Sequence, residues 1–121
     1  MIDKNDNNTC ISFFKNQVKN FVEERGWKKY HSPKNLVQAL NCEAGELSQL
    51  FLFKEHNIED IMKDKTLLNN IADESADVFI YLISLINSLD LDLTSTFLKK
   101  MLKNKKKYPI SEFNNGIYFK K

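Results

Sequence analysis

The sequence predicts an all-α protein in which four helices form a bundle. Three glycines and two prolines in 121 residues are too few for the many turns of an all-β fold. Apolar residues recur at helical spacing in four segments, and polar stretches separate these segments. Four amphipathic helices joined by short connections pack most simply as a helical bundle.

The first predicted helix covers about residues 9–25. Asn8 or Thr9 is expected to be its N-cap, because both side chains can accept a hydrogen bond from the first turn. Gly26 is expected to end the helix as a C-terminal cap, since glycine adopts the left-handed conformation without strain. Residues 27–31 are predicted to form a connection.

The second helix is predicted to cover residues 32–53, because it opens with a serine that can cap and a proline suited to the first helical position. The polar residues 54–65 are expected to form a loop. The third helix is predicted over residues 66–88. Asp92 is the expected N-cap of a fourth helix, and Pro109 is expected to end it and to begin a C-terminal tail.

Length and composition predict a single domain over residues 1–121, with a core of about 9–109 and a loose N-terminus. A net charge of +2 is too small to indicate a nucleic-acid-binding protein, so no nucleic acid is expected as a partner. Two cysteines are too few for a disulfide framework. With no membrane-spanning run and no signal-peptide pattern, a cytoplasmic location without a membrane partner is expected.

Two short pairs of acids are the most informative motif. Glu43 and Glu46 are three residues apart, as are Glu74 and Asp77, so each pair projects from nearly one face of its helix. At about 100° per residue, Glu43 and Glu74 fall in the middle of apolar stripes. Glu46 and Asp77 fall about 60° to the same side of each stripe. Two helices therefore repeat one arrangement of acids.

Burying a lone carboxylate costs several kcal/mol, and four acids converging between two helices would repel one another. A divalent cation bound by the four carboxylates removes both difficulties. Ligands that are oxygen only suit a hard ion, which indicates Mg²⁺, for which Mn²⁺ can substitute. The alternative for any one pair is a solvated helix surface or a carboxylate paired with lysine.

The acid pairs stand in an ordered set of motifs that covers about residues 18–109. The motifs are Glu24-Arg25-Gly26-Trp27, His31-Ser32-Pro33-Lys34-Asn35-Leu36, Glu43-Ala44-Gly45-Glu46-Leu47, Glu74-x-x-Asp77, Asp77-Val78-Phe79-Ile80-Tyr81-Leu82, and Lys100-Met101 followed by Asn104 and Lys107-Tyr108-Pro109. This order of motifs resembles the all-α nucleoside triphosphate pyrophosphatases. Within them the chain is similar to the small MazG-like proteins, and above all to the dCTP pyrophosphatases.

The resemblance implies Mg²⁺-dependent hydrolysis of a nucleoside triphosphate between its α- and β-phosphates. The products would be the monophosphate and pyrophosphate, and the expected substrate is dCTP or a related or modified pyrimidine deoxynucleotide. The resemblance implies that the four acids are the metal ligands and catalytic residues. It also implies a homodimer or homotetramer, and a symmetric dimer is the commonest oligomer.

The resemblance also implies residues that bind the substrate. Lys100 and Asn104 correspond to contacts with the triphosphate, and they share one face of the fourth helix. Three aromatic residues correspond to the base pocket, namely Trp27, Phe53 and Tyr81. His31 corresponds to a family histidine to which the resemblance assigns no role. Phe53 stands where the relatives have tryptophan, which leaves the preferred base open. Packing in the core is the alternative for the aromatic residues.

Two further interpretations follow from the residues. Phe79, Leu82, Ile83 and Ile86 are left over after the third helix supplies its core stripe, so we expect them at a helical interface between copies.

A non-catalytic module that binds nucleotide or nucleic acid through the lysine-rich end of the fourth helix is the alternative function. Such a module would bind without releasing pyrophosphate and would depend steeply on salt.

Overall fold

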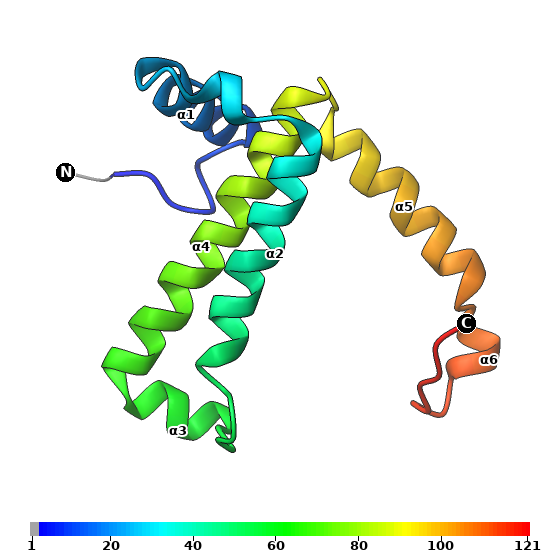
Figure 1. The fold of residues 1–121 in the computed structure, drawn as a ribbon. Coiled ribbons are helices and arrows are strands. Elements are labelled where there is room, and N and C mark those ends of the chain that lie inside the picture. Colours follow the sequence, from blue (N-terminus) through cyan, green and yellow to red (C-terminus); the bar gives the residue numbers. More distant parts are fainter. Residues whose placement is uncertain (1–2) are drawn as a thin grey trace. The chain divides into compact units, whose positions relative to one another are not determined.

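The computed structural model describes residues 3–121, and all regular structure within that range is helical (Figure 1). The prediction of an all-α fold is confirmed. The chain divides into two compact units, Met1–Asp90 and Leu91–Lys121, and each is described by itself below. No single helix of the described range is long and apolar enough to span a membrane. Within that range, the helices Lys65–Ser88 and Leu93–Lys107 meet the criterion of length and composition only when they are taken together across the break between them.

The first unit is built on two long helices, α2 (Pro33–Gln49) and α4 (Lys65–Ser88), which lie side by side and run in opposite directions (Figure 1). The short helix α3 (Ile58–Lys63) lies where the chain turns from one to the other. Helix α1 (Ile11–Glu24) packs on α4 at the opposite end of the pair. The α2–α4 pair is therefore the scaffold on which both acid pairs are mounted.

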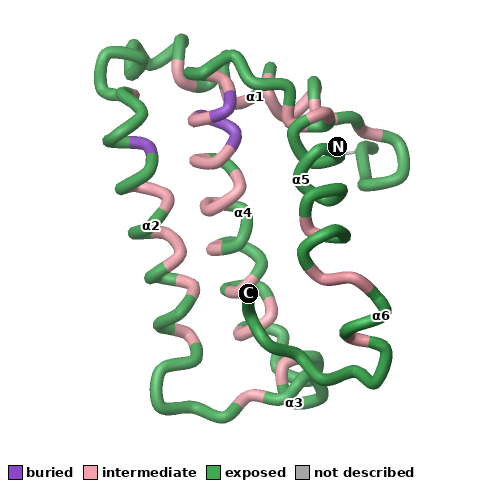
Figure 2. The backbone as a smooth tube through the Cα atoms, turned by 90° about the vertical axis from the view of Figure 1, so that its right-hand side faces the viewer, coloured by how far each residue is buried: buried purple, intermediate pink, exposed green. Residues whose placement is uncertain are grey.

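The buried core lies at the α1 end of this pair (Figure 2). Leu36 of α2 is 1% exposed, and Ile83 and Ile86 of α4 are 0% and 5% exposed. Phe14 of α1 packs edge-on against Phe79 of α4, with ring centroids 5.4 Å apart. Ile83 and Ile86 were expected at an interface between copies, and that expectation is wrong, because α1 covers this end of α4 within one chain.

Both ends of α1 depart in part from the prediction. The helix begins after Cys10, whose side chain makes no capping hydrogen bond, so neither Asn8 nor Thr9 is the cap. Asn8 instead bonds within the preceding turn, where its side-chain oxygen accepts from the Asn5 backbone N–H at 2.8 Å. Gly26 follows the helix at φ 66°, as predicted for a C-terminal glycine. The expected connection contains a short 3₁₀ helix, Trp27–Tyr30.

Helix α2 begins as predicted, with the Ser32 hydroxyl accepting from the Asn35 backbone N–H at 3.2 Å, but it ends at Gln49 rather than near residue 53. The following residues form turns, and Phe53 reaches φ 57°, a left-handed conformation that cannot continue a helix. The expected loop contains α3, which was missed because it is only six residues long. Its cap was present in the sequence, since the Asn57 side chain accepts from the Asp60 backbone N–H at 2.9 Å.

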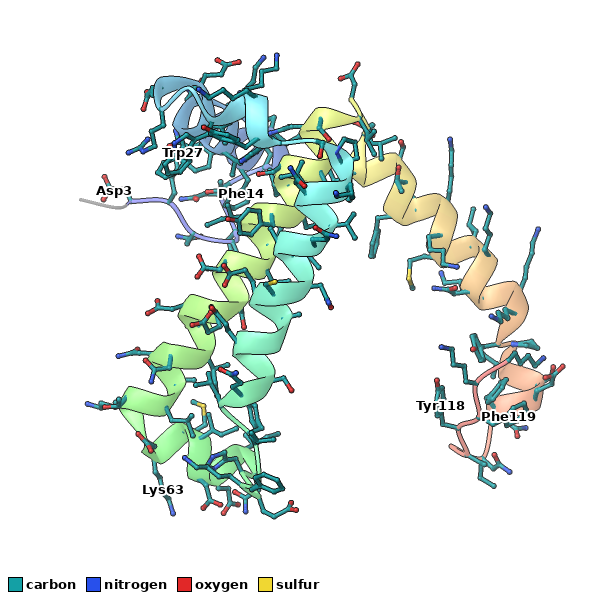
Figure 3. The ribbon with its side chains drawn as sticks, in the orientation of Figure 1. Asp3, Phe14, Trp27, Lys63, Tyr118 and Phe119 are labelled. Carbon is teal, nitrogen blue, oxygen red and sulfur yellow. The ribbon has the colours of Figure 1, made fainter. Side chains whose placement is uncertain are left out.

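The second unit contains α5 (Leu93–Lys107) and the short helix α6 (Ile110–Phe113). The Asp92 carboxylate accepts from the Ser95 backbone N–H at 3.0 Å, which confirms the predicted cap of α5. The expected tail folds back as an aromatic cluster (Figure 3). Tyr118 stacks on Tyr108 with centroids 6.5 Å apart, and Phe119 packs on Phe113 at 4.8 Å.

Candidate active site

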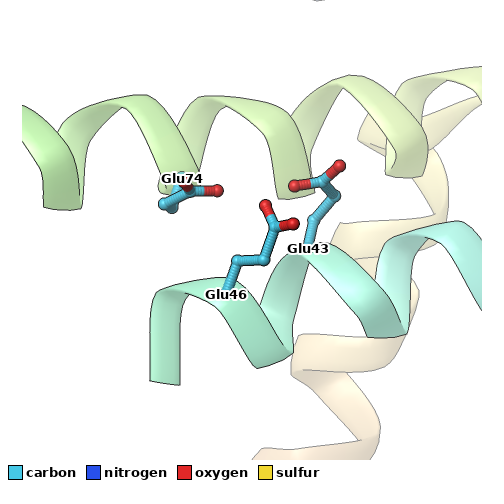
Figure 4. A group of neighbouring side chains, drawn as sticks. All are labelled: Glu43, Glu46 and Glu74. Atoms are coloured by element: carbon cyan, nitrogen blue, oxygen red, sulfur yellow. The ribbon is translucent and has the colours of Figure 1, made fainter. Parts of the chain in front are cut away.

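Three carboxylates from the two long helices point toward one another in the first unit (Figure 4). Glu43 and Glu46 come from α2 and Glu74 from α4. Each offers an oxygen atom, and the three oxygens lie within 4.8 Å of one another. The antiparallel packing of α2 on α4 brings these acids together, although Glu46 and Glu74 are 28 positions apart in the sequence.

The burial of these acids follows the pattern of the apolar stripes. Glu43 and Glu74 are half-buried, whereas Glu46 is exposed. One oxygen of Glu43 and one of Glu74, the Oε2 atom in each case, are fully buried and have no hydrogen-bond partner among the described residues. A buried polar atom without a partner is costly, and such atoms in native structures commonly indicate a missing ion or water.

The electrostatics of the cluster disfavour three ionised acids. The pKa of Glu43 is raised from 4.5 to about 7, first by a hydrogen bond with Glu46, then by burial and by the neighbouring negative charges. The pKa of Glu74 is also raised, mainly by burial and then by Glu46 and the charge of Asp77. The protein therefore holds these acids in a conformation that a positive charge between them would stabilise.

Asp77 lies near the cluster but is not one of the three converging acids. It is half-buried on α4, one helical turn after Glu74. Its charge contributes to raising the pKa of both Glu43 and Glu74, which places it within their electrostatic surroundings. The sequence predicted four ligands, and the structure brings three of them together, with Asp77 beside them.

The raised pKa of Glu43 predicts that the metal-free protein loses stability as pH rises from about 4.5 to about 7. In this range the folded state holds a proton on Glu43 that the unfolded chain has released, so the free energy of unfolding falls with pH. Melting temperatures of wild type and Glu43→Gln across this range, without divalent ions, measure the effect. The difference between the two should grow in favour of the variant as pH rises. A constant difference would contradict the prediction.

The cluster fits a divalent cation of the kind expected from the sequence. Two ligands on opposite sides of one Mg²⁺ are about 4.2 Å apart, because each Mg–O distance is about 2.1 Å. The three oxygens already lie within 4.8 Å of one another, so small side-chain movements would complete the geometry. The donors are all carboxylate oxygens, which hard ions prefer, and two of the three residues, Glu43 and Glu74, have a buried oxygen that lacks a partner among the described residues.

The aromatic residues predicted to contact the base differ in their surroundings. Tyr81 is half-buried on α4, one turn beyond Asp77. Trp27 is 44% exposed, and its ring makes an edge-to-face contact with that of Phe21, with centroids 5.7 Å apart. Phe53 is 99% exposed, which excludes a packing role for it in the described range.

The other predicted residues do not join the acids within the first unit. His31 follows the 3₁₀ helix and lines a cavity that contains none of the four acids. Lys100 is exposed and Asn104 is half-buried on α5, in the second unit. Their roles stay predictions. The same cavity is lined by Lys19, Lys28 and Asn87, which the sequence did not single out, because polar residues on a helix face look like solvated surface.

Comparisons with known proteins show which sequences and which fold the chain resembles. No family model matches the chain. The dCTP pyrophosphatase 1 of Mus musculus is 35% identical over 94 residues, which is 74% of this chain and 54% of that protein. The Homo sapiens protein of the same name is 36% identical over 93 residues, 74% of this chain and 53% of that one. The chain thus spans about half the length of the curated relatives it matches.

Among solved structures, a pyrophosphatase from Archaeoglobus fulgidus superposes with a TM-score of 0.75 and 29% sequence identity. The match covers 90% of this chain and 99% of that one, so it extends beyond the acid pairs to nearly the whole fold. The chain is similar in sequence to dCTP pyrophosphatases and in fold to a solved pyrophosphatase, and these likenesses are consistent with the all-α nucleoside triphosphate pyrophosphatase superfamily.

Proposed function

We propose that this protein is a Mg²⁺-dependent nucleoside triphosphate pyrophosphohydrolase. It would cleave dCTP, or a related or modified pyrimidine deoxynucleotide, to the monophosphate and pyrophosphate. The observation that carries the proposal is the group of three carboxylates from α2 and α4, with two buried oxygens that have no partner among the described residues. The relatives named dCTP pyrophosphatase support the substrate class.

Glu43, Glu46 and Glu74 would hold the ion, and Asp77 would complete the ligand set from the adjacent turn of α4. When bound, Mg²⁺ would neutralise phosphate charge, orient the triphosphate and make a bound water more acidic. Mn²⁺ would serve in its place, because it accepts the same oxygen ligands. The protein contributes carboxylates from two packed helices that are already gathered in one place before the ion binds.

Recognition of the nucleotide would rest on the residues around this centre. The exposed side chains of Trp27 and Phe53, with Tyr81, would offer aromatic rings on which a base can stack, and stacking is worth about 1–3 kcal/mol per base. Lys100 and Asn104 would contact the triphosphate, as the family resemblance implies, and His31 would contribute to substrate binding.

Incubation with a panel of deoxynucleoside triphosphates and Mg²⁺ tests the proposal. The expected products are a nucleoside monophosphate and pyrophosphate in equal amounts, with pyrimidine substrates preferred. Chromatography of the nucleotide product, together with separate assays for pyrophosphate and orthophosphate, distinguishes the outcomes. A nucleoside diphosphate with orthophosphate would mean attack at the γ-phosphate and would contradict the proposal. Binding without turnover would favour the non-catalytic module instead.

We also propose that the active protein is a homodimer or homotetramer. Apolar side chains on the two scaffold helices are exposed, with Val37 at 51% on α2 and Ile80 at 41% on α4. Two more apolar side chains are exposed nearby in the sequence: Leu52, in the turn after α2, is 59% exposed, and Met62 of α3 is 61% exposed. Burial of such surface against a second copy is favourable at about 25 cal/mol per Å² of apolar area.

A further inference from the structure

The turn after α6 contains the only asparagine of the chain that a glycine follows, Asn115 before Gly116. Both residues are exposed and lie outside the helices. The backbone nitrogen that follows an asparagine can attack the side-chain amide carbon and close a five-membered ring. Glycine obstructs this attack least, because it has no Cβ beside its nitrogen. The turn belongs to the second unit and shares no residue with the acid cluster or with the cavity that His31 lines.

A hydrogen bond of the turn favours this reaction. The Oδ1 atom of Asn115 accepts from the Ile117 backbone N–H at 3.2 Å. Negative charge develops on Oδ1 when the amide carbon is attacked, so a donor already directed at this oxygen stabilises the intermediate. The same bond folds the side chain back over its own backbone, as in an Asx turn. The amide carbon is therefore held on the side of the chain where the Gly116 nitrogen lies.

Another hydrogen bond opposes the reaction. The Gly116 backbone N–H donates to the Phe113 carbonyl, and the nitrogen must lose this proton before it can attack. The bond is 3.2 Å long, at the upper end of the usual range for N–H···O bonds. Phe113 is also the last residue of a helix of only four residues, and such helix ends open at little cost in free energy. This bond therefore delays the attack without preventing it.

We propose that Asn115 is a site of spontaneous covalent modification, which proceeds through a succinimide formed with Gly116. The Gly116 nitrogen loses its proton to hydroxide and bonds to Cγ of Asn115, and the Cγ–Nδ2 bond breaks to release ammonia. Water then opens the ring at either of its two carbonyl carbons. One opening gives aspartate, and the other gives isoaspartate, in which the main chain runs through the side-chain carbons. Water is the co-reactant, and no atom is oxidised or reduced.

The modification changes how the C-terminal tail packs. The turn connects α6 to the two aromatic residues that fold back on the second unit, Tyr118 on Tyr108 and Phe119 on Phe113 (Figure 3). Isoaspartate lengthens the main chain within this turn by one carbon, and both products carry a carboxylate in place of the amide. Packed side chains lose much of their contact energy when they are displaced by a fraction of an ångström. Conversion of Asn115 therefore loosens both aromatic contacts.

Incubation of the full chain without metal or nucleotide, at neutral and at mildly alkaline pH, tests the proposal. Digestion and mass spectrometry should show an amide replaced by a carboxyl at residue 115 before any other asparagine reacts, at a rate that rises with hydroxide concentration. Isoaspartate should accompany aspartate, because direct hydrolysis of the side-chain amide gives aspartate alone. In parallel NMR spectra, the native signals of Tyr118 and Phe119 should be lost in step with the modification.

Two variants complete the experiment. Asn115→Ser removes the reacting amide and should abolish both the modification at this position and the slow change in the NMR spectrum. Asn114→Ser is the matched control and should leave the rate unchanged, because Asn114 is exposed in the same turn but precedes an asparagine.

Three results would overturn the proposal. Aspartate without isoaspartate at residue 115 would exclude the succinimide, and earlier reaction of another asparagine would exclude the site. Native signals of Tyr118 and Phe119 in fully modified protein would exclude the effect on the tail. None of these results bears on the proposed activity, which is measured on freshly prepared protein with Mg²⁺.

Discussion

Replacement of Glu43 or Glu74 by glutamine should reduce pyrophosphate release by at least about a thousandfold while the helices remain folded. Metal ions supply several kcal/mol of stabilisation to developing phosphate charge, and each 1.36 kcal/mol is tenfold in rate. Glutamine keeps the size of the side chain but removes the charge that holds the ion. Steady-state kinetics at saturating Mg²⁺, with circular dichroism as the check on folding, measure both parts of the expectation.

Asp73→Asn is the matched control for this experiment. Asp73 precedes Glu74 on α4, is exposed, and does not belong to the group of converging acids. Its replacement removes one negative charge from the same turn of the same helix and should leave the rate within about twofold, since surface changes away from special features have small effects. Near-wild-type turnover in Glu43→Gln or Glu74→Gln would refute the assignment of the ligands.

Ile83→Ala should destabilise the protein by about 2–5 kcal/mol, the range for truncating a buried isoleucine to alanine. Ile83 is 0% exposed. Among the described residues, the other buried apolar side chains are those of Leu36 and Ile86. A small domain has a free energy of unfolding of only about 5–15 kcal/mol, so a large share of it would be lost. Urea denaturation gives the change directly.

The same substitution three residues earlier provides the control. Ile80→Ala removes the same atoms from the same helix, but Ile80 is 41% exposed, so less burial is lost and any cavity opens to solvent. Its cost in the monomer should be well below that of Ile83→Ala. Equal losses for the two variants would show that Ile80 is buried in solution, as it would be at an interface between copies.

The sequence predicted the long helices well because their signals are repeated over many residues. α4 was placed within one residue at its start, since apolar positions recur along all 24 residues and Asp64 caps it by accepting from the Leu67 backbone N–H. The short elements α3 and α6 were missed, because six and four residues are too few to show a period. Their existence depends on local caps and on contacts with neighbouring segments.

The acid cluster was predictable for a different reason. A glutamate in the middle of an apolar stripe must point toward the neighbouring helix, so Glu43 and Glu74 could be paired before any coordinates were known. The conformation of Phe53 and the cavity beside α1 could not be predicted in this way. Both depend on how the chain turns after a helix and how a third helix lies across two others, which the spacing of residues does not encode.

The position of the buried core has a consequence for the motions of the α2–α4 pair. Leu36, Ile83 and Ile86 all lie near the α1 end, whereas α2 and α4 hold no fully buried residue from the acids to α3. Local opening costs least where few apolar contacts are broken, so amide hydrogens near α3 should exchange with solvent sooner than those beside α1. The half of the pair from the acids to α3 should therefore open more readily than the half beside α1. A ligand that bridges Glu43 and Glu74 would hold α2 and α4 together in this region, where few buried apolar contacts do so.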